Sequence, residues 1–493
     1  MTAPPLSLPV RLAMAAIIMA AVFTAHGNTL TFDYIWEDRN NFIDESPVKD
    51  WRNIPRFFVR SAHEGFSVSH VTPYYRPVTV TSWGIDWLIF RGNPAGSHLL
   101  NILIHWGASI LLFSIALRLT GGFSPSLAAA LLFAVHPAGV ESVAYVAARA
   151  DILCTLFMAG SFLAYLRFRD SGRMRQALLS LLLYLLALLS KEPAVMMPLF
   201  LLAAQWGERE QTPLRRLLAP PLAAALLVAA YLFLRSHLLS RTSWDQTPLL
   251  ERFWTSIHVT GKYLLTLLFP ADLRTFYDIP TLVSPLQTEV WTGGVVILLW
   301  CGVSALLVRA GHRRGGVLLL LVPLSLLPSS NLPAMILPSP VALRYLHFPL
   351  AIFSFAAAAT LAPLPAVRVL GKPVPLGVLP LFLLIPPATF YTATTSIRWK
   401  ENDRFFTAML ADAPKSPLAF KLAANHYGKS GRGGEMARLY AVAYTLTRNR
   451  QIETAREMIR LGEPRRAREE LLKLPNPLGD REVVEILSSL GGR

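Results

Sequence analysis

The sequence predicts an all-α membrane protein, a polytopic bundle of about eleven spanning helices with amphipathic helices in its outer loops and a small helical domain at the C-terminus. Of its 493 residues, 53% are hydrophobic and only 16% are charged, a balance typical of membrane proteins. Apolar runs of 15 to 20 residues recur between Val10 and Tyr391. Because these runs are apolar on every side, they are expected to face lipid or one another.

Eleven runs are long enough to cross a bilayer with modest tilt. They cover residues 9–27, 97–117, 123–136, 149–167, 175–190, 193–207, 217–235, 290–308, 316–330, 346–362 and 374–392. If the N-terminus is cytoplasmic, every short inner connection is basic, as the positive-inside bias requires. The first run has a basic start with Arg11 and precedes small residues, as in a cleavable signal peptide, but the ten later spans favour an uncleaved helix.

Three long segments then lie on the outer side, residues 28–96, 236–289 and 393–493. The first two contain Trp, Tyr, Pro and scattered charge, which suits amphipathic helices at the membrane interface. The apolar stretch 253–269 is predicted to be interfacial or re-entrant, because a further span there would place the basic residues 309–314 outside.

The chain becomes charged and helix-forming in its last part, so we expect a membrane domain over residues 1–397 and a tail over 398–493. Gly431 and Gly462 each follow a helix, short turn, helix pattern, and they lie 31 residues apart. This spacing is close to the tetratricopeptide period of about 34 residues, although about three repeats are usually needed for a free-standing solenoid. The tail is therefore expected to lean on the membrane domain or to continue in a partner.

Composition also argues against two classes of site. The formal net charge of +16 comes largely from basic residues at the ends of the apolar runs, where they counter anionic headgroups, so no nucleic-acid partner is predicted. Cys154 and Cys301 both lie within apolar runs, so neither a disulfide framework nor a cysteine-based metal site is expected.

Polar residues within the apolar body are candidates for function, because a charged group there costs about 2.5 to 3.5 kcal/mol on insertion scales. On the predicted topology they gather on the outer side. They are Glu37, Asp38, Arg76, His98, Asn101, His105, His136, Glu141, Arg149, Asp151, Lys191, Glu192, Asn331, Arg344, Tyr345 and His347. One shared outer cavity is the economical interpretation. A carboxylate pair beside Arg and Lys suits sugar transfer from a lipid phosphate, because a base activates the acceptor hydroxyl while cations stabilise the leaving phosphate.

The same segments resemble the C-type glycosyltransferases (GT-C, glycosyltransferase family 39-like), and within them the transmembrane and tetratricopeptide-repeat-containing O-mannosyltransferases and their bacterial relatives. The resemblance rests on WEDRNNFIDESP, YYRPVTVTSW, NPAGSHLLNILIH, LLFAVHPAGVESVAYVAARADIL, LLSKEPAVMMPLFLL, LPSSNLP and ALRYLHFPLA, in this order over roughly residues 30–360. It implies a polyprenyl phosphate sugar donor, an inverting transfer and an acidic base in the first outer loop. The family usually has two aspartates where this chain has Glu37 and Asp38. We therefore expect Asp38 to be the base, and the substitution leaves open which carboxylate is catalytic and whether a divalent metal is held.

Roles for the remaining residues follow from the resemblance and from charge. Four residues are predicted to bind the donor phosphate: Arg344, Lys191, Tyr345 and Arg149. Five more are expected to line the substrate pocket: Arg76, His136, Glu141, Asp151 and Glu192. Arginine suits phosphate because its planar fork donates two parallel hydrogen bonds, and lysine adds a point charge. The plainer alternatives are internal salt bridges between helices and, for Arg344, a snorkelling anchor.

Two other function classes stay open at this point. A lipid or sugar transporter or flippase also uses intramembrane charge, although its polar groups usually lie near the midplane and between inverted repeats. An inactive scaffold with a partner-binding tail is the second alternative. The expected partners of an enzyme are the polyprenyl phosphate sugar, membrane lipids and an acceptor protein, lipid or glycan. We expect a bacterial inner membrane, with a cytoplasmic N-terminus and a periplasmic tail.

Overall fold

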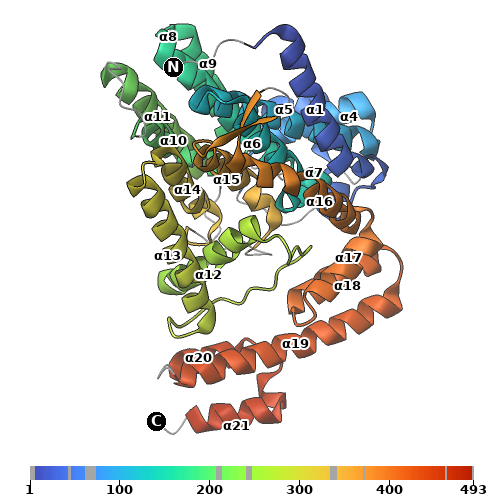
Figure 1. Cartoon of the computed structure of the whole chain (residues 1–493). Helices are drawn as coiled ribbons and strands as arrows, with labels where there is room; N and C mark the ends of the chain where they lie inside the picture. Colours follow the sequence, from blue (N-terminus) through green and yellow to red (C-terminus); the bar gives the residue numbers. More distant parts are fainter. Residues whose placement is uncertain are drawn as a thin grey trace. The chain divides into compact units, whose positions relative to one another are not determined.

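The computed structural model describes residues 6–42, 46–60, 74–206, 214–239, 247–333, 341–369, 372–460 and 464–490 (Figure 1). The chain forms two compact units. The membrane unit comprises Met1–Thr275 and Ile279–Phe405, and the tail unit comprises Phe276–Asp278 and Phe406–Arg493.

All eleven apolar segments of the sequence prediction are helical in the membrane unit. The helices are α1 (Leu8–His26), α5 (Pro94–Thr120), α6 (Phe123–Val135), α8 (Arg149–Ser171), α9 (Met174–Leu188), α10 (Met197–Trp206), α11 (Leu214–Leu238), α13 (Thr288–Arg309), α14 (Arg313–Ser325), α15 (His347–Leu361) and α16 (Leu379–Ser396). Within the described residues, six helical segments are long and apolar enough to cross a membrane: Leu8–Thr31, Pro94–Thr120, Val146–Ser171, Leu217–Leu238, Thr288–Arg309 and Leu376–Trp399. A seventh span results if α6 and the next helix are counted together. The all-α, polytopic fold is therefore confirmed, while five of the predicted spans are short or broken helices.

The remaining helical elements of the membrane unit connect these helices. They are η1 (Gly27–Thr31), α2 (Glu37–Phe42), η2 (Pro47–Lys49), η3 (Trp51–Asn53), α3 (Ile54–Phe57), α4 (Pro77–Phe90), η4 (Pro137–Gly139), α7 (Val140–Ala144), η5 (Val146–Ala148), η6 (Glu192–Met196), α12 (Leu249–Leu268), η7 (Leu327–Ser329), η8 (Leu343–Leu346), η9 (Leu376–Val378) and η10 (Ile397–Trp399). A two-stranded antiparallel hairpin, β1 (Ala366–Val369) and β2 (Lys372–Pro375), follows α15, where the sequence analysis expected only a basic inner connection.

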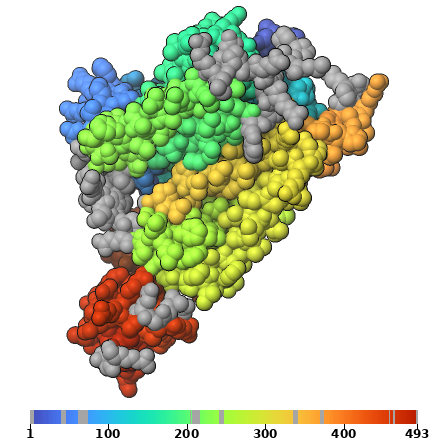
Figure 2. All heavy atoms as spheres, turned by 90° about the vertical axis from the view of Figure 1, so that its left-hand side faces the viewer, coloured from blue at the N-terminus to red at the C-terminus, as the bar shows by residue number. Residues whose placement is uncertain are grey.

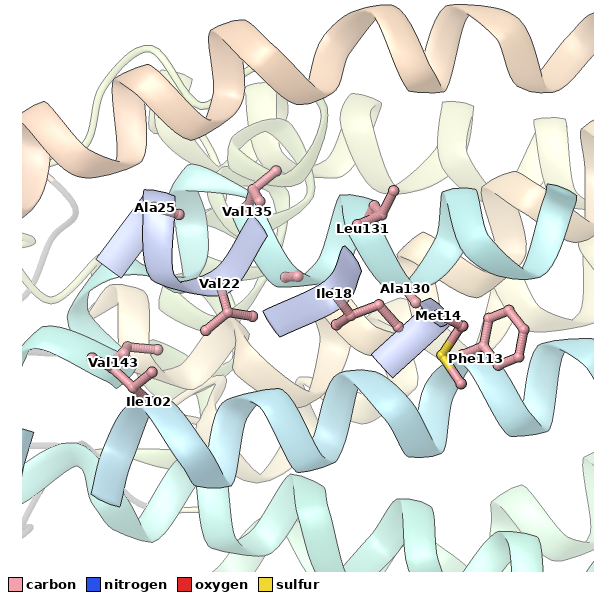
Figure 3. Packing of buried hydrophobic residues seen from close by; sticks show 11 residues of the cluster. Met14, Ile18, Val22, Ala25, Ile102, Phe113, Ala130, Leu131, Val135 and Val143 are labelled. Carbon is pink, nitrogen blue, oxygen red and sulfur yellow. The ribbon is translucent and has the colours of Figure 1, made fainter. Parts of the chain in front are cut away.

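Helix α6 lies at the centre of the unit, against α1, α5, α15 and α16 (Figure 1). Three consecutive alanines, Ala128 to Ala130, are fully buried on it, and small residues of this kind let neighbouring helices approach closely. Met14, Ile18 and Val22 of α1 recur every fourth residue and form one apolar stripe (Figure 3). This stripe packs against α5 and α6 in a cluster that also contains Ile102, Phe113, Leu131 and Val135.

Other helices present apolar side chains outward. The face in Figure 2 includes α11, in green, and α13, in yellow. Leu226 and Phe233 of α11 and Leu298 and Leu299 of α13 are among the exposed residues. Because large exposed apolar surfaces are rare on soluble proteins, this surface is typical of helices that face lipid.

Helix α12, predicted as interfacial or re-entrant, is one continuous helix that lies against α13. A Cβ atom on Gly261 would lie 2.5 Å from the Gly293 Cα atom, so the two backbones meet at glycine. Its predicted orientation in the membrane stays a prediction.

Replacing Gly293 with alanine is expected to lower the free energy of unfolding by about 1–3 kcal/mol, because an added Cβ would lie 2.5 Å from the Ile257 carbonyl oxygen. Gly302→Ala on the same helix is the control, since its Cβ would have no neighbour within 4 Å. Thermal unfolding in detergent measures both variants. Equal unfolding temperatures would contradict tight packing between α12 and α13.

The regular elements among the described residues of the tail unit are all helices. Their series begins within α17 (Asn402–Asp412) and continues with α18 (Pro417–Lys429), α19 (Gly433–Arg460), α20 (Pro464–Leu472), η11 (Pro477–Gly479) and α21 (Arg481–Leu490). Helices α18 and α19 pack together across a turn in which Gly431 has φ 76°, a value that favours glycine. The first predicted helix–turn–helix is therefore present, whereas the predicted turn at Gly462 lies outside the described residues.

Candidate active site

The two carboxylates of the first outer loop differ sharply in exposure. Asp38 is completely buried, and its Oδ1 atom accepts a hydrogen bond from the Ala147 backbone N–H at 2.7 Å. Its other oxygen accepts a longer bond from the Ile35 N–H, at 3.4 Å. Glu37 is exposed, and its Oε2 atom accepts a hydrogen bond from the Tyr145 hydroxyl at 3.2 Å. Asp38 therefore ties the loop to the start of η5, while Glu37 is accessible from outside.

The residue before this pair has an unusual backbone. Trp36 has φ 45°, the left-handed region that bulky residues rarely adopt. Such conformations persist only where the surroundings enforce them, and they cluster at functional sites. The strain thus lies next to the predicted catalytic carboxylates.

Burial raises the pKa of Asp38 from 3.8 to about 8, outweighing the backbone hydrogen bonds that favour the charged form. The stability that protonated Asp38 provides is complete below about pH 4 and is lost as the pH rises through about 8. We expect the free energy of unfolding to fall by up to about 1.4 kcal/mol per pH unit within this window. The loss should be absent in Asp38→Asn and retained in the exposed control Asp33→Asn, as measured by thermal unfolding in detergent from pH 5 to 9. An unchanged pH dependence in Asp38→Asn would contradict the assignment.

Arg344, in η8, pairs with Glu141 of α7, which is 203 residues away in sequence. One guanidinium nitrogen forms a salt bridge with the Glu141 Oε1 atom. The Arg344 backbone N–H donates to the other oxygen at 3.2 Å. The Arg344 side chain keeps 19% of its surface exposed, whereas that of Glu141 keeps 4%. A ligand can therefore reach the arginine more readily than its partner.

Lys191 pairs with Asp151, and Tyr345 lies next to both cations. The Lys191 ammonium forms a salt bridge with the Asp151 Oδ2 atom, and both side chains are nearly buried. The Lys191 Nζ atom lies 4.8 Å from the centre of the Tyr345 ring, and the Arg344 Cζ atom lies 5.0 Å from it. These are cation–π distances, so one tyrosine ring brings together two predicted phosphate ligands.

The third ion pair joins Arg76 to Glu192. The Arg76 Nη2 and Nε atoms donate to the Glu192 carboxylate at 2.7 and 3.2 Å, in a fork geometry. The guanidinium also stacks 4.1 Å above the Tyr74 ring. Electrostatic interactions connect Tyr74 with Arg344 and Glu37, so this pair belongs to the same cluster.

Tyr145 links the carboxylate loop to the cations. It binds Glu37 directly and interacts electrostatically with Asp38, Arg344 and Glu141. Tyr74 and Tyr145 were not predicted as site residues. Their signal in the sequence is position, since Tyr74 stands two residues before Arg76 and Tyr145 stands between Glu141 and Arg149.

Two predicted residues lie outside this cluster. Arg149 has no exposed side-chain surface and forms a salt bridge with Asp86 at 2.7 Å. Its guanidinium also donates to Asn101 and to the Ser97 carbonyl, so it fastens α4 and α5 to α8. We therefore leave Arg149 out of the donor site.

His136 also serves the fold. It accepts the Ala138 N–H at the break between α6 and the following helix, where the chain bends by 49°. Its other ring nitrogen lies 3.1 Å from the Leu267 carbonyl oxygen. The His136 side chain thus caps the start of η4 by accepting the Ala138 N–H. Pro137, the residue between them, has no N–H of its own.

His105 and His347 form a separate buried network with Thr155. His105 Nδ1 lies 3.0 Å from His347 Nε2, and the other His347 nitrogen lies 2.8 Å from the Thr155 hydroxyl. These contacts give His105 a role in packing the helices together. Among the described residues, no group of three or more His, Cys, Asp or Glu side chains could hold a metal ion.

An apolar cavity of about 120 Å³ begins close to the ion pairs. Its lining comes mainly from five helices, α5, α8, α10, α14 and α15. It includes Thr155, one helical turn after Asp151, and Phe348, one turn after Arg344. The Met197 and Phe200 side chains of α10 line it as well, shortly after Lys191. The first turn of α8 and the segments just before α10 and α15 thus carry charged residues of the cluster, and these three helices contribute side chains to the cavity wall.

The chain is an all-α integral membrane protein, and comparisons with known proteins agree that it resembles the GT-C glycosyltransferases. The family described as dolichyl-phosphate-mannose-protein mannosyltransferase matches residues 84–239. This stretch contains Glu141, Asp151, Lys191 and Glu192, and it does not include Glu37, Asp38, Arg76 or Arg344.

The particular relatives are O-mannosyltransferases. The chain is 40% identical over 142 residues to protein O-mannosyl-transferase TMTC4 of Homo sapiens, which covers 24% of this chain and 19% of that protein. It is 32% identical over 180 residues to protein O-mannosyl-transferase Tmtc1 of Drosophila melanogaster, covering 36% and 21% respectively. The Drosophila protein Tmtc2 is 34% identical over 183 residues, covering 35% and 19%. The chain thus spans about a fifth of the length of these curated relatives.

Proposed function

We propose that this protein is a membrane glycosyltransferase that moves a sugar from a polyprenyl phosphate-linked donor to an acceptor hydroxyl, with inversion at the anomeric carbon. The observation that carries the proposal is the charged cluster around Tyr345, in which Asp151 and Arg344 each stand four residues before a residue that lines an apolar cavity. A donor of this class needs both surfaces, because its phosphate is anionic and its polyprenyl chain is apolar. The similarity to O-mannosyltransferases makes mannose the first sugar to test.

Arg344 and Lys191 hold the donor phosphate in this proposal. They flank the Tyr345 ring, and Arg344 retains exposed surface. As the bond between the sugar carbon and the phosphate oxygen breaks, its electron pair stays on the phosphate. Fixed cations are worth most at the place where charge develops in this way. Glu141 and Asp151 hold the two cations in position before the donor arrives.

The base comes from the carboxylate pair. The sequence predicts Asp38, but this carboxyl is completely buried and both of its oxygens accept backbone hydrogen bonds, so it is poorly placed to meet an acceptor hydroxyl. We therefore assign the base to Glu37, which is exposed and oriented by Tyr145. Glu37 takes the proton of the acceptor hydroxyl, whose oxygen then attacks the anomeric carbon from the face opposite the phosphate. Asp38 holds the loop in place below it.

The cellular setting belongs to the proposal as well. The resemblance and the basic inner connections favour a bacterial inner membrane, a cytoplasmic N-terminus and a tail in the periplasm. The tail unit would then lie on the side of the acceptor, which we take to be a protein, a lipid or a glycan.

The direct test incubates the purified full chain in nanodiscs with a panel of polyprenyl phosphate sugars and hydroxyl acceptors. Release of free polyprenyl phosphate, with an inverted glycosidic product, is the expected result. Glu37→Gln is the matched inactive control. If intact donor crosses a liposome membrane and no polyprenyl phosphate is released, the protein is a flippase and not an enzyme. If the protein neither releases polyprenyl phosphate nor translocates the donor, the scaffold alternative remains.

A further inference from the structure

We infer that Asn402 and Phe405 are positioning residues for the carboxylate pair, although they lie more than 360 residues after it in the sequence. This inference rests on the proposed function, because it gives these residues a task in catalysis. It concerns the last residues of the membrane unit, immediately before the tail unit begins at Phe406.

The first contact acts on the strained backbone. The Trp36 N–H donates to the Asn402 Oδ1 atom at 2.8 Å. Trp36 has φ 45°, and a tryptophan keeps this conformation only if its surroundings enforce it. Since Glu37 follows directly, the direction of its side chain depends on this backbone geometry. Asn402 therefore sets where the Glu37 carboxylate lies.

The second contact holds the Trp36 side chain. Its ring is stacked on Phe405, with the ring centres 5.6 Å apart, and on Tyr145, with the centres 6.1 Å apart. Phe405 is buried, and Tyr145 is the residue that donates to Glu37. The indole is thus clamped between the final part of the membrane unit and the site itself. Loss of the Phe405 ring would leave the Trp36 side chain free to move. Because Tyr145 stacks on Trp36, the hydrogen bond from Tyr145 to Glu37 would be loosened as well.

Further bonds join the same two segments and set the register between them. The Asp33 N–H donates to the Lys400 carbonyl oxygen at 2.8 Å. The Asn28 side-chain amide donates to the Ala393 carbonyl oxygen and to the Ser396 hydroxyl, both at 2.8 Å. Trp399, which stands between Ser396 and Lys400 in the sequence, is almost completely buried. These bonds fix the register between the two segments without Asn402. The specific role of the Asn402 side chain is therefore to hold the Trp36 backbone.

The test compares Asn402→Leu with Asn402→Asp. Leucine removes the acceptor oxygen at similar size, whereas aspartate keeps it. We expect Asn402→Leu to lower kcat about 100-fold, the scale of a displacement near 1 Å, while KM for the donor stays within about twofold. Asn402→Asp should restore most of the rate. Glu401→Gln is the matched control, because Glu401 is exposed and precedes Asn402 directly.

A second readout does not depend on activity. Glu37→Cys, made together with Cys301→Ala, places a thiol at the site, while the native Cys154 is buried. The rate at which a maleimide reagent modifies this thiol should change when Asn402→Leu or Phe405→Leu is added, and should not change with Glu401→Gln. Phe405→Leu also keeps the test valid if Asn402→Leu fails to fold.

The outcomes separate the two proposals. Wild-type kcat and an unaltered modification rate in Asn402→Leu would overturn the positioning role, as would an equal loss of rate in the leucine and aspartate variants. If the wild-type protein transfers no sugar from any donor, the proposed function fails. In that case a changed modification rate still supports the clamp, and an unchanged rate overturns it.

Discussion

Glu37→Gln is expected to lower kcat by about 10²–10⁴-fold, the usual contribution of a general base. Glutamine keeps the length of the side chain and an oxygen that can accept a hydrogen bond from the Tyr145 hydroxyl, but it cannot take a proton from the acceptor. Because Glu37 is exposed, the unfolding temperature should stay close to that of the wild-type protein. Initial rates of polyprenyl phosphate release, with donor and acceptor varied separately, give kcat and KM.

The neighbouring variant distinguishes the two carboxylates. Asp38→Asn should lower kcat less than Glu37→Gln does, because its effect passes through the position of the loop. Asp33→Asn, in the same loop and exposed, is the control for nonspecific loss of charge. If Asp38→Asn abolishes transfer while Glu37→Gln stays active, the base is Asp38, as the sequence alone predicts.

The helical fold could be predicted because its signal is local. An apolar run of sufficient length forms a helix in a membrane whatever the rest of the chain does, since its backbone groups must be satisfied within the segment. The number of spans was harder to predict, because an apolar run shows that a helix forms but does not show where it ends or breaks. Helix α14 ends at Ser325 and α6 at Val135, and both are too short to pass as spans on their own. Composition does not reveal how a break at Pro137 divides one apolar run into two helices.

Most of the charged residues of the cluster could be predicted, but its tyrosines Tyr74 and Tyr145 and the pairing inside it could not. Arg344 and Arg149 are both arginines near the starts of helices, and nothing local distinguishes them. Tertiary packing does, because Arg149 meets Asp86 in a fully buried pair, whereas Arg344 keeps exposed surface beside Tyr345. The different burial of Glu37 and Asp38 is likewise set by residues far away in sequence, such as Ala147. A one-dimensional pattern identifies which residues are polar, and the fold determines which of them are already occupied.

Arg344→Gln is the substitution with the largest combined effect on activity and stability. It removes the proposed phosphate ligand, and we expect kcat to fall about 10²–10³-fold, as for other groups that stabilise developing charge. It also leaves Glu141 buried without its cation, which typically lowers the free energy of unfolding by about 3–5 kcal/mol. The two losses must be separated, because an internal salt bridge alone would produce the second.

A double-mutant cycle separates them. Glu141→Gln added to Arg344→Gln removes the unpaired charge, so the double variant should regain most of the stability of the wild-type protein. It should not regain activity, because one of the two cations proposed to hold the phosphate is still missing and Lys191 acts without it. The control cycle uses Lys262→Gln and Asp272→Asn, a partly exposed pair at 3.2 Å, for which we expect no loss of kcat. Recovery of transfer together with stability in the double variant would mean that Arg344 only anchors η8 to α7, and Lys191 would be left to bind the phosphate without it.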